Sequence, residues 1–240
     1  MPDWQVIVAG GGHAGCEAAL ASARSGARTL VLTLNLDTIA HMPCNPSIGG
    51  QGKGQLVREI DALGGEMGKA ADETHIQARL LNTRKGLAVQ AIRVQSDKPS
   101  YGAYMRDALL SCPNLTLQQA LITELLTSGD RVIGVRTASG DTFQTSVVIL
   151  APGTFLRGLI HIGSTRFPAG RAGEPPAEAL GESLIRAGLP ILRFKTGTPP
   201  RVAIDSICFD SLECQPDEPS TPSFSLNSQR SSLPRRSCHL

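Results

Sequence analysis

The spacing of apolar and polar residues changes period near the N-terminus, and the change predicts a β–α–β unit. Residues 6–9 (Val-Ile-Val-Ala) form a short apolar run that is typical of a buried strand. Residues 16–25 then place small and apolar side chains at helical spacing, and Gly26 is suited to end that helix. A second apolar run at residues 28–33 predicts the next strand, which completes the unit.

Helical patterns recur in the middle of the chain. One covers residues 59–71 and is interrupted by Gly64 and Gly65. Two more helices are expected over residues 74–81 and 101–111.

Residues 115–143 alternate with a period of two and predict a β-meander. Its strands are expected at residues 115–119, 121–127, 132–137 and 142–143. The wholly apolar residues 147–150 predict a buried strand. A last helix is expected over residues 177–187, and periodicity fades after Arg201. The fold class that these elements indicate is α/β.

Composition narrows the class of protein. The chain has 240 residues, of which 41% are hydrophobic and 18% charged, with a net charge of +2. No apolar run approaches the length of a membrane span, and we expect no targeting segment, because residues 1–12 show no basic region followed by an apolar one. The six cysteines include no Cys-x-x-Cys pair, so we expect reduced thiols and a cytoplasmic location. No metal site is expected, because the cysteines and the histidine near the C-terminus lack zinc-finger spacing.

The turn between the first strand and the first helix carries Gly-x-Gly-x-x-Gly at Gly10, Gly12 and Gly15. Gly10 suits a sharp turn, Gly12 lets the backbone approach a pyrophosphate, and Gly15 allows the helix to pack closely on the strand. This pattern predicts dinucleotide binding at a helix N-terminus. Thr33 stands where an acidic residue would hold the adenosine ribose, so that position does not distinguish FAD from NAD.

Two further stretches suggest chemistry. The sequence HMPCNPSIGGQGKGQ, residues 41–55, places Cys44 between two prolines and ahead of a glycine-rich turn with Lys53. Such a cysteine is either a reactive thiol or a packing residue. Residues 79–106 hold six basic side chains and one acid, which indicates either a solvated surface or a contact for phosphates of a cofactor or an RNA.

These motifs together resemble the GidA/MnmG family of FAD-dependent tRNA-modifying enzymes. The resemblance is carried, in order along the chain, by GGGHAGCEAA, DTIAHMPCNPSIGGQGKGQLVREIDALGG, LLNTRKGLAVQAIRVQSDKPSY, GTFLRGLIHIG, AGRAGEPP and RFKTGTPPR. It covers nearly the whole chain and fades after about residue 205. Leu87 stands where the family usually has proline.

The resemblance implies a glutathione-reductase-like, Rossmann-like FAD-binding fold over residues 1–204. Residues 205–240 would then be the truncated and poorly ordered start of an inserted domain. The implied activity adds a carboxymethylaminomethyl group to carbon 5 of the tRNA wobble uridine. The implied co-substrates are NADH and methylenetetrahydrofolate, and the implied partners are tRNA, the GTPase MnmE and a second copy of the chain.

The resemblance also implies site residues. Cys44 would be catalytic, either as a nucleophile or as a general acid or base. Ile122 would meet the adenine through its backbone, and Ala177, where the family often has serine, would contact the flavin. The pyrophosphate loop would be Gly10, Gly11, Gly12, His13, Ala14 and Gly15.

Three alternatives to this activity stay open. The chain could belong to a folate- and FAD-dependent tRNA methyltransferase of the TrmFO type, to a generic flavoprotein oxidoreductase, or be an inactive truncated fragment.

Overall fold

The computed structural model describes residues 3–43, 45–171 and 173–240. Within it, contacts group residues 3–41 with 106–194 as unit 1, and residues 42–105 with 195–240 as unit 2. This grouping by contacts is separate from the expected domain boundary at residue 204, which stays a prediction.

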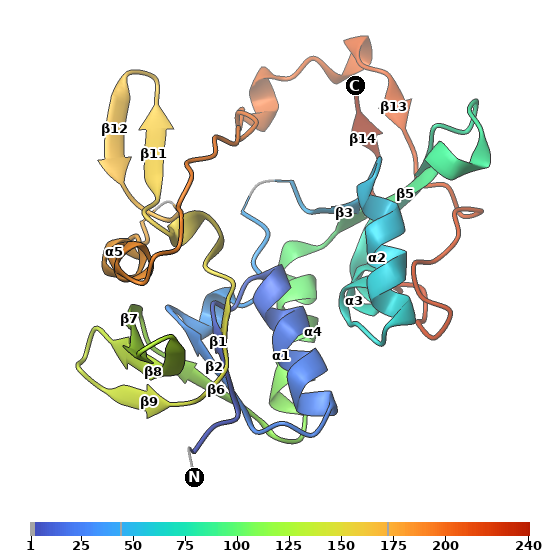
Figure 1. The fold of residues 1–240 in the computed structure, drawn as a ribbon. Helices are drawn as coiled ribbons and strands as arrows, with labels where there is room; N and C mark the ends of the chain where they lie inside the picture. The colour runs from blue at the N-terminus through green and yellow to red at the C-terminus, as the bar shows by residue number, and fades with distance from the viewer. Residues whose placement is uncertain (1–2, 44, 172) are drawn as a thin grey trace. The chain divides into compact units, whose positions relative to one another are not determined.

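Unit 1 is built on a four-stranded parallel sheet with the order β10-β1-β2-β6 (Figure 1). Its strands are β1 (Val6–Ala9), β2 (Thr29–Thr33), β6 (Leu115–Gln119) and β10 (Val148–Leu150). Helix α1 (His13–Arg24) connects β1 to β2, which confirms the predicted β–α–β unit. A short 3-10 turn, η1 (Leu36–Thr38), follows β2.

Helix α1 packs along one face of this sheet through its small side chains. Cys16, Ala19, Leu20 and Ala23 are all buried, and α1 contacts each of the four strands. Side chains alternate between the two faces of a sheet along each strand. Ile7 and the residues that share its face therefore point to the side away from α1. There they join an apolar cluster with residues of the meander and of the last helix.

The antiparallel meander has three strands: β7 (Ile122–Ser128), β8 (Arg131–Thr137) and β9 (Thr142–Gln144). The prediction that residues 115–119 belong to it was wrong, because β6 pairs in parallel with β2 from Thr29↔Leu115 to Thr33↔Gln119. Strand β10 was expected to be fully buried, but its three residues are half-buried because it is an edge strand of the parallel sheet.

The rest of unit 1 follows β10. The 3-10 turn η3 (Gly153–Phe155) leads to a hairpin of β11 (Leu159–Ile162) and β12 (Thr165–Pro168), which the sequence did not predict. Helix α5 (Glu178–Arg186) then packs on β7, where the hydroxyl of Ser183 accepts a 2.9 Å hydrogen bond from the Leu125 amide.

Unit 2 contains a three-stranded antiparallel sheet with the order β3-β5-β4. Its strands are β3 (Ser47–Gly49), β4 (His75–Leu81) and β5 (Ala91–Ser96), with the 3-10 turn η2 (Leu87–Val89) before β5. The helix predicted over residues 74–81 was wrong, because these residues pair with β5 from His75↔Ser96 to Leu81↔Ala91. The predicted break at Gly64 and Gly65 is confirmed: α2 (Lys53–Ala62) and α3 (Met67–Thr74) are separate helices.

Helix α4 (Lys98–Leu110) runs from unit 2 into unit 1. Tyr101, Met105 and Leu109 recur every four residues on it and are completely buried. This spacing places one apolar stripe along the helix.

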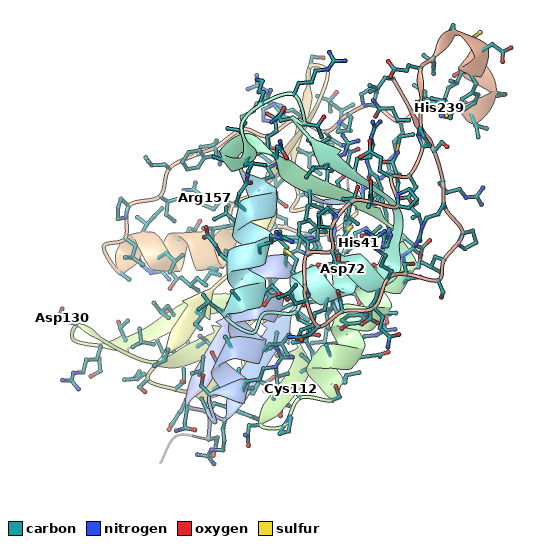
Figure 2. The ribbon with its side chains drawn as sticks, turned by 90° about the vertical axis from the view of Figure 1, so that its right-hand side faces the viewer. His41, Asp72, Cys112, Asp130, Arg157 and His239 are labelled. Atoms are coloured by element: carbon teal, nitrogen blue, oxygen red, sulfur yellow. The ribbon has the colours of Figure 1, made fainter. Side chains whose placement is uncertain are left out.

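The C-terminal segment wraps onto α3 and β4 within unit 2. It contains the 3-10 turns η4 (Ile204–Ser206) and η5 (Phe209–Ser211), and its strands β13 (Cys214–Gln215) and β14 (Cys238–His239) pair with each other. Asp72, which lies on α3 (Figure 2), is 3% exposed. Its carboxylate accepts hydrogen bonds from the amides of Phe224 (2.9 Å) and Ser225 (2.8 Å) and from the Ser228 hydroxyl (2.5 Å).

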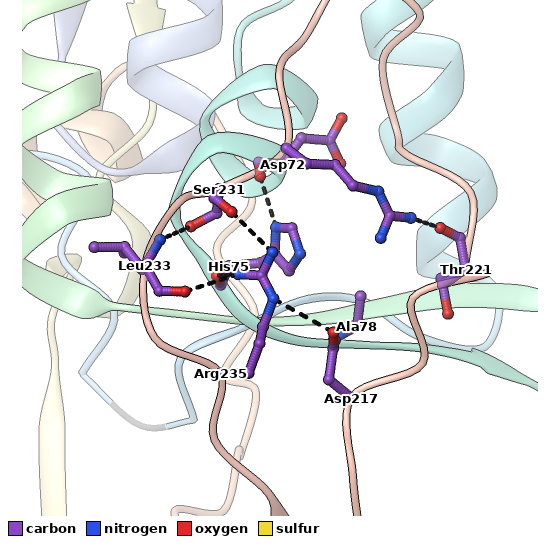
Figure 3. A network of polar contacts seen from close by, with 9 residues as sticks. Asp72, His75, Ala78, Asp217, Thr221, Ser231, Leu233 and Arg235 are labelled. Atoms are coloured by element: carbon purple, nitrogen blue, oxygen red, sulfur yellow. Dashed lines mark hydrogen bonds and ion pairs between the residues drawn. The ribbon is translucent and has the colours of Figure 1, made fainter.

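Further along the segment, Arg235 donates to the carbonyl of His75 at 2.9 Å and pairs with Asp217 at 3.3 Å (Figure 3). Asp217 in turn accepts a hydrogen bond from the Ala78 amide at 2.7 Å. The segment is therefore held on α3 and β4 by hydrogen bonds that involve the backbone, and an ion pair links Asp217 to Arg235 within it.

Candidate dinucleotide site

The glycine loop between β1 and α1 is shaped by two close backbone approaches. Gly10 has φ +115°, and a β-carbon there would lie 2.3 Å from the carbonyl oxygen of Ala151. A β-carbon on Gly15 would lie 1.9 Å from the carbonyl oxygen of Gly10. Only glycine fits at either position, so the loop closes tightly over the ends of β1 and β10.

Gly12 differs from these two glycines because open space surrounds it. It is exposed, begins helix α1 with φ −76°, and a β-carbon there would meet no atom within 4 Å. No side chain caps the helix at this point, and its first turn holds no acidic residue. The positive end of the helix dipole therefore lies beside the open space at Gly12, where an anion can approach the first turn.

The side chains of the loop and of the first turn add no negative charge at neutral pH. Burial lowers the pKa of His13, which favours the neutral imidazole. Burial, reinforced by the nearby negative charge of Glu17, raises the pKa of Cys16 to about 12, so its thiol stays protonated. Cys16 is therefore a packing residue of α1, as its place on the inner face of the helix indicates.

Thr33 at the end of β2 lies directly behind the loop. A β-carbon on Gly11 would lie 2.8 Å from the Thr33 hydroxyl oxygen. The Thr33 side chain is nearly buried, at 9% exposure. The position that commonly carries a ribose-binding acid is thus occupied by a short side chain packed against Gly11.

Ile122 and Ala177 lie together in the apolar cluster of unit 1, at 4% and 6% exposure. The Ala177 amide donates to the carbonyl of Phe155 at 2.7 Å, and its own carbonyl accepts from Arg157 at 3.4 Å. Ala177 therefore has its backbone groups engaged within the fold. The cofactor contacts expected at Ile122 and Ala177 stay predictions.

Cys44 lies outside the described residues, but the motif that follows it is described. Gly49, Gly50 and Gly52 all have φ between +70° and +97°, and a β-carbon on Gly49 would lie 2.3 Å from the carbonyl oxygen of Ile92. These glycines let the turn pack against β5. Beside them is a pocket of about 390 Å³ lined by Asn45, Ser47, Ile48, Gly49, Lys53, Val57 and Met67.

Sequence reasoning missed the contacts that hold the segment after β10. Thr154 donates to the carbonyl of Gly170 at 2.7 Å, and Gly170 lies against the ring of Phe155. The Arg171 guanidinium lies 5.5 Å from the same ring. It also pairs with Glu174, and this hydrogen bond lowers the pKa of the Glu174 carboxyl. Thr154 and Phe155 lie 15 or 16 residues before Gly170 and Arg171, so no local pattern indicates these contacts. The Arg171–Glu174 pair is local, since the two residues lie three positions apart.

The described residues contain neither a cluster of metal ligands nor a membrane-spanning helix. Across residues 3–43, 45–171 and 173–240, no three His, Cys, Asp or Glu side chains gather to hold a metal ion. In the same part of the chain, no helix is both long and apolar enough to cross a membrane.

Residues 5–240 match the family described as glucose inhibited division protein A. The chain is 51% identical over 237 residues to a tRNA uridine 5-carboxymethylaminomethyl modification enzyme MnmG of Protochlamydia amoebophila. It is 50% identical over 226 residues to the protein of that name from Aquifex aeolicus. These alignments cover 99% and 94% of this chain but only 38% and 37% of the relatives. The chain therefore spans under two-fifths of their length.

Solved structures agree with this match. The structure of Aquifex aeolicus GidA in its form II crystal superposes with a TM-score of 0.93 at 46% identity, covering 99% of this chain and 41% of that one. A GidA-related protein from Thermus thermophilus gives a TM-score of 0.56 at 27% identity, covering 76% of this chain and 68% of that one. The α/β, Rossmann-like fold expected from the sequence is thus confirmed.

Proposed function

Because this chain belongs to the glucose inhibited division protein A (GidA) family, we propose that it forms the FAD-binding part of a tRNA-modifying enzyme. The proposed reaction adds a carboxymethylaminomethyl group to carbon 5 of the wobble uridine. The relatives carry the modification of tRNA uridine in their names. The proposal extends that activity to an enzyme that contains this chain.

The observation that carries the cofactor proposal is the open space at Gly12. The first amides of α1 would hold the pyrophosphate of FAD there, and Gly10 and Gly15 keep the loop close to the strand ends, as such a contact requires. The residues fit the group, since no acidic side chain stands in the first helical turn to repel it. FAD, when bound, supplies reversible redox chemistry to the reaction.

Cys44 is the proposed catalytic thiol. A thiolate that adds to carbon 6 of uracil makes carbon 5 a carbon nucleophile. Carbon 5 would then bond to the one-carbon unit from methylenetetrahydrofolate and lose its proton, and the thiolate would leave carbon 6. Such a cysteine needs access to substrate and a lowered pKa. Support comes from the motif that follows it, which lines a pocket and carries the Lys53 cation.

The remaining parts of the reaction belong to the same proposal. NADH would supply reducing equivalents, methylenetetrahydrofolate would supply one carbon, and the GTPase MnmE and a second copy of the chain would complete the assembly. A cytoplasmic location is proposed with them, since tRNA is modified there.

The activity proposal is tested in a full-length enzyme. This chain replaces the matching N-terminal part of the Aquifex aeolicus relative, and the nucleosides of treated tRNA are measured by mass spectrometry. We expect carboxymethylaminomethyluridine from this chimera. We expect none from its Cys44→Ser variant, and an unchanged yield from the control Cys208→Ser, whose cysteine is exposed.

Two results would contradict the proposal. Equal yields from the Cys44→Ser and Cys208→Ser chimeras would remove Cys44 from the mechanism. A methylated uridine in place of the expected product would instead assign the chain to a TrmFO-type methyltransferase.

A further inference from the structure

An exposed loop in unit 2, residues 82–90, carries positive charge that no acidic residue offsets. It joins β4 to β5, whose ladder ends at the pair Leu81↔Ala91. Residues 83–89 are all exposed, and they include Arg84 and Lys85. The hairpin of residues 75–96 contains no Asp or Glu. The charge of this loop is therefore presented to solvent.

The loop is braced from within, so its shape is set before any ligand arrives. The Asn82 side chain donates to the carbonyl of Val89 at 2.9 Å, and the Gln90 side chain donates to the carbonyl of Lys85 at 3.0 Å. The Lys85 amide donates to the carbonyl of Asn82 at 2.9 Å. A loop held in this way loses little conformational entropy on binding.

Helix α2 and the turn that precedes it hold the loop from outside. The Gln55 side chain donates to the carbonyl of Gln90 at 3.1 Å, and the Gln51 side chain donates to the side-chain oxygen of Asn82 at 3.1 Å. These bonds place the N-terminus of α2 beside the loop. That N-terminus begins with the exposed Lys53 and has no acidic residue in its first turn. Its dipole adds to the positive potential of the loop.

Within the described part of the chain, the cations at the loop lack an acidic partner, whereas Arg79 in the middle of the hairpin has one. Arg79 on β4 forms a 2.8 Å ion pair with Glu218 of the C-terminal segment. Among the described residues, no acidic group lies within ion-pair distance of Lys53, Arg84 or Lys85. Glu218 of the C-terminal segment thus neutralises the charge of Arg79, while no described residue compensates the charges of the loop at the end of the hairpin.

We propose that the loop of residues 82–90, together with Lys53, binds the phosphate backbone of an RNA. Arg84 can grip a phosphate with two parallel N–H groups, and the two lysines act as point charges. Leu87 at the tip is 85% exposed and provides an apolar surface for an unstacked base or a ribose. Lipid surfaces are typically bound by clusters of about four to eight cations, more than this loop presents.

The inference rests on the proposed function for the identity of the RNA, namely the tRNA that the enzyme modifies. The phosphate chemistry itself is general, so a first experiment uses a transcript of a tRNA anticodon stem-loop with uridine at the wobble position. Its binding to the 240-residue chain is measured by fluorescence anisotropy across a series of salt concentrations.

The test variant is Arg84→Glu with Lys85→Glu. The matched control is Arg131→Glu with Arg166→Glu, which makes the same change in net charge at two exposed arginines of unit 1. We expect the loop variant to bind about tenfold more weakly, and the slope of log K against log salt to shrink by about 1.4, as for two lost contacts to a single strand. The control variant should change the slope much less.

Equal slopes and affinities in the two variants would overturn the proposal, as would an absence of binding by the unmodified chain. Binding to vesicles of phosphatidylglycerol that depends on Arg84 and Lys85, without RNA binding, would overturn it in favour of a lipid surface. Retention of FAD is read from the absorption spectrum of the same samples. Loss of flavin with intact, loop-dependent RNA binding would contradict the proposed function and leave this inference standing.

Discussion

Gly15 of α1 lies so close to Gly10 that a β-carbon on Gly15 would stand 1.9 Å from the carbonyl oxygen of Gly10. The contact is with backbone, which cannot turn aside as a flexible side chain can. The start of α1 is therefore fixed against the end of β1 by the absence of one methyl group. The amides that the helix offers to an anion are positioned by this contact.

Gly15→Ala should force α1 away from the loop. We expect the free energy of unfolding to fall by about 1–3 kcal/mol, as for an overpacked core position, and FAD to be lost on gel filtration. Urea unfolding and the absorption spectrum measure the two effects. A variant with normal stability and normal flavin content would show that the close approach does not shape the site.

Gly12→Ala should weaken FAD binding while leaving the fold almost unchanged. Its added methyl group meets no protein atom within 4 Å, and φ −76° is open to any residue. Stability should fall by only about 0.5 kcal/mol, the difference between glycine and alanine at a helix start. FAD affinity should fall at least about tenfold, because the methyl group takes space that the pyrophosphate needs. Unchanged affinity in a titration would place the phosphates elsewhere.

Asp72→Asn should loosen the C-terminal segment. The carboxylate accepts from two amides and one hydroxyl, and the new amide group of asparagine would face at least one of these donors. We expect a loss of about 1–3 kcal/mol in unfolding free energy and faster proteolysis within residues 217–236. Asp210→Asn, at an exposed position of η5, is the control. Identical cleavage rates in the two variants would contradict the role given to Asp72.

Cys16 should resist alkylation at pH 8. Burial and Glu17 raise its pKa to about 12, so its thiolate becomes common only as the pH approaches that value. Among the described cysteines, the exposed Cys208 and Cys214 should react with iodoacetamide before the half-buried Cys112, which lies just beyond α4 (Figure 2). Peptide mass spectrometry reads the order. Early modification of Cys16 in the folded chain would show that its site is open.

The parts of the fold that were predicted correctly are those whose sequence patterns lie next to one another along the chain. The strand, turn and helix of residues 6–33 follow one another along the chain, so their order needed no distant partner. The strand β4 was mistaken for a helix because its identity depends on β5, which begins ten residues after β4 ends. The place of β6 in the parallel sheet likewise depends on β2, more than eighty residues before it.

The candidate site likewise has features that local sequence predicts and features that depend on distant residues. The roles of Gly10, Gly12 and Gly15 as turn, open approach and close packing could be predicted from their spacing, and the backbone geometry agrees with them. The contact of Gly10 with Ala151 needed the tertiary fold. Asp72 carried no signal at all, since an acidic residue on a short helix usually faces solvent.

The central claim is that residues 10–15 hold FAD, and the visible absorption spectrum of the purified 240-residue chain tests it most directly. The chain is incubated with FAD and passed through a gel-filtration column, with the Gly12→Ala variant alongside. We predict a flavin band that travels with the folded chain and is reduced in the variant. A folded, monodisperse chain that emerges without flavin would contradict the claim.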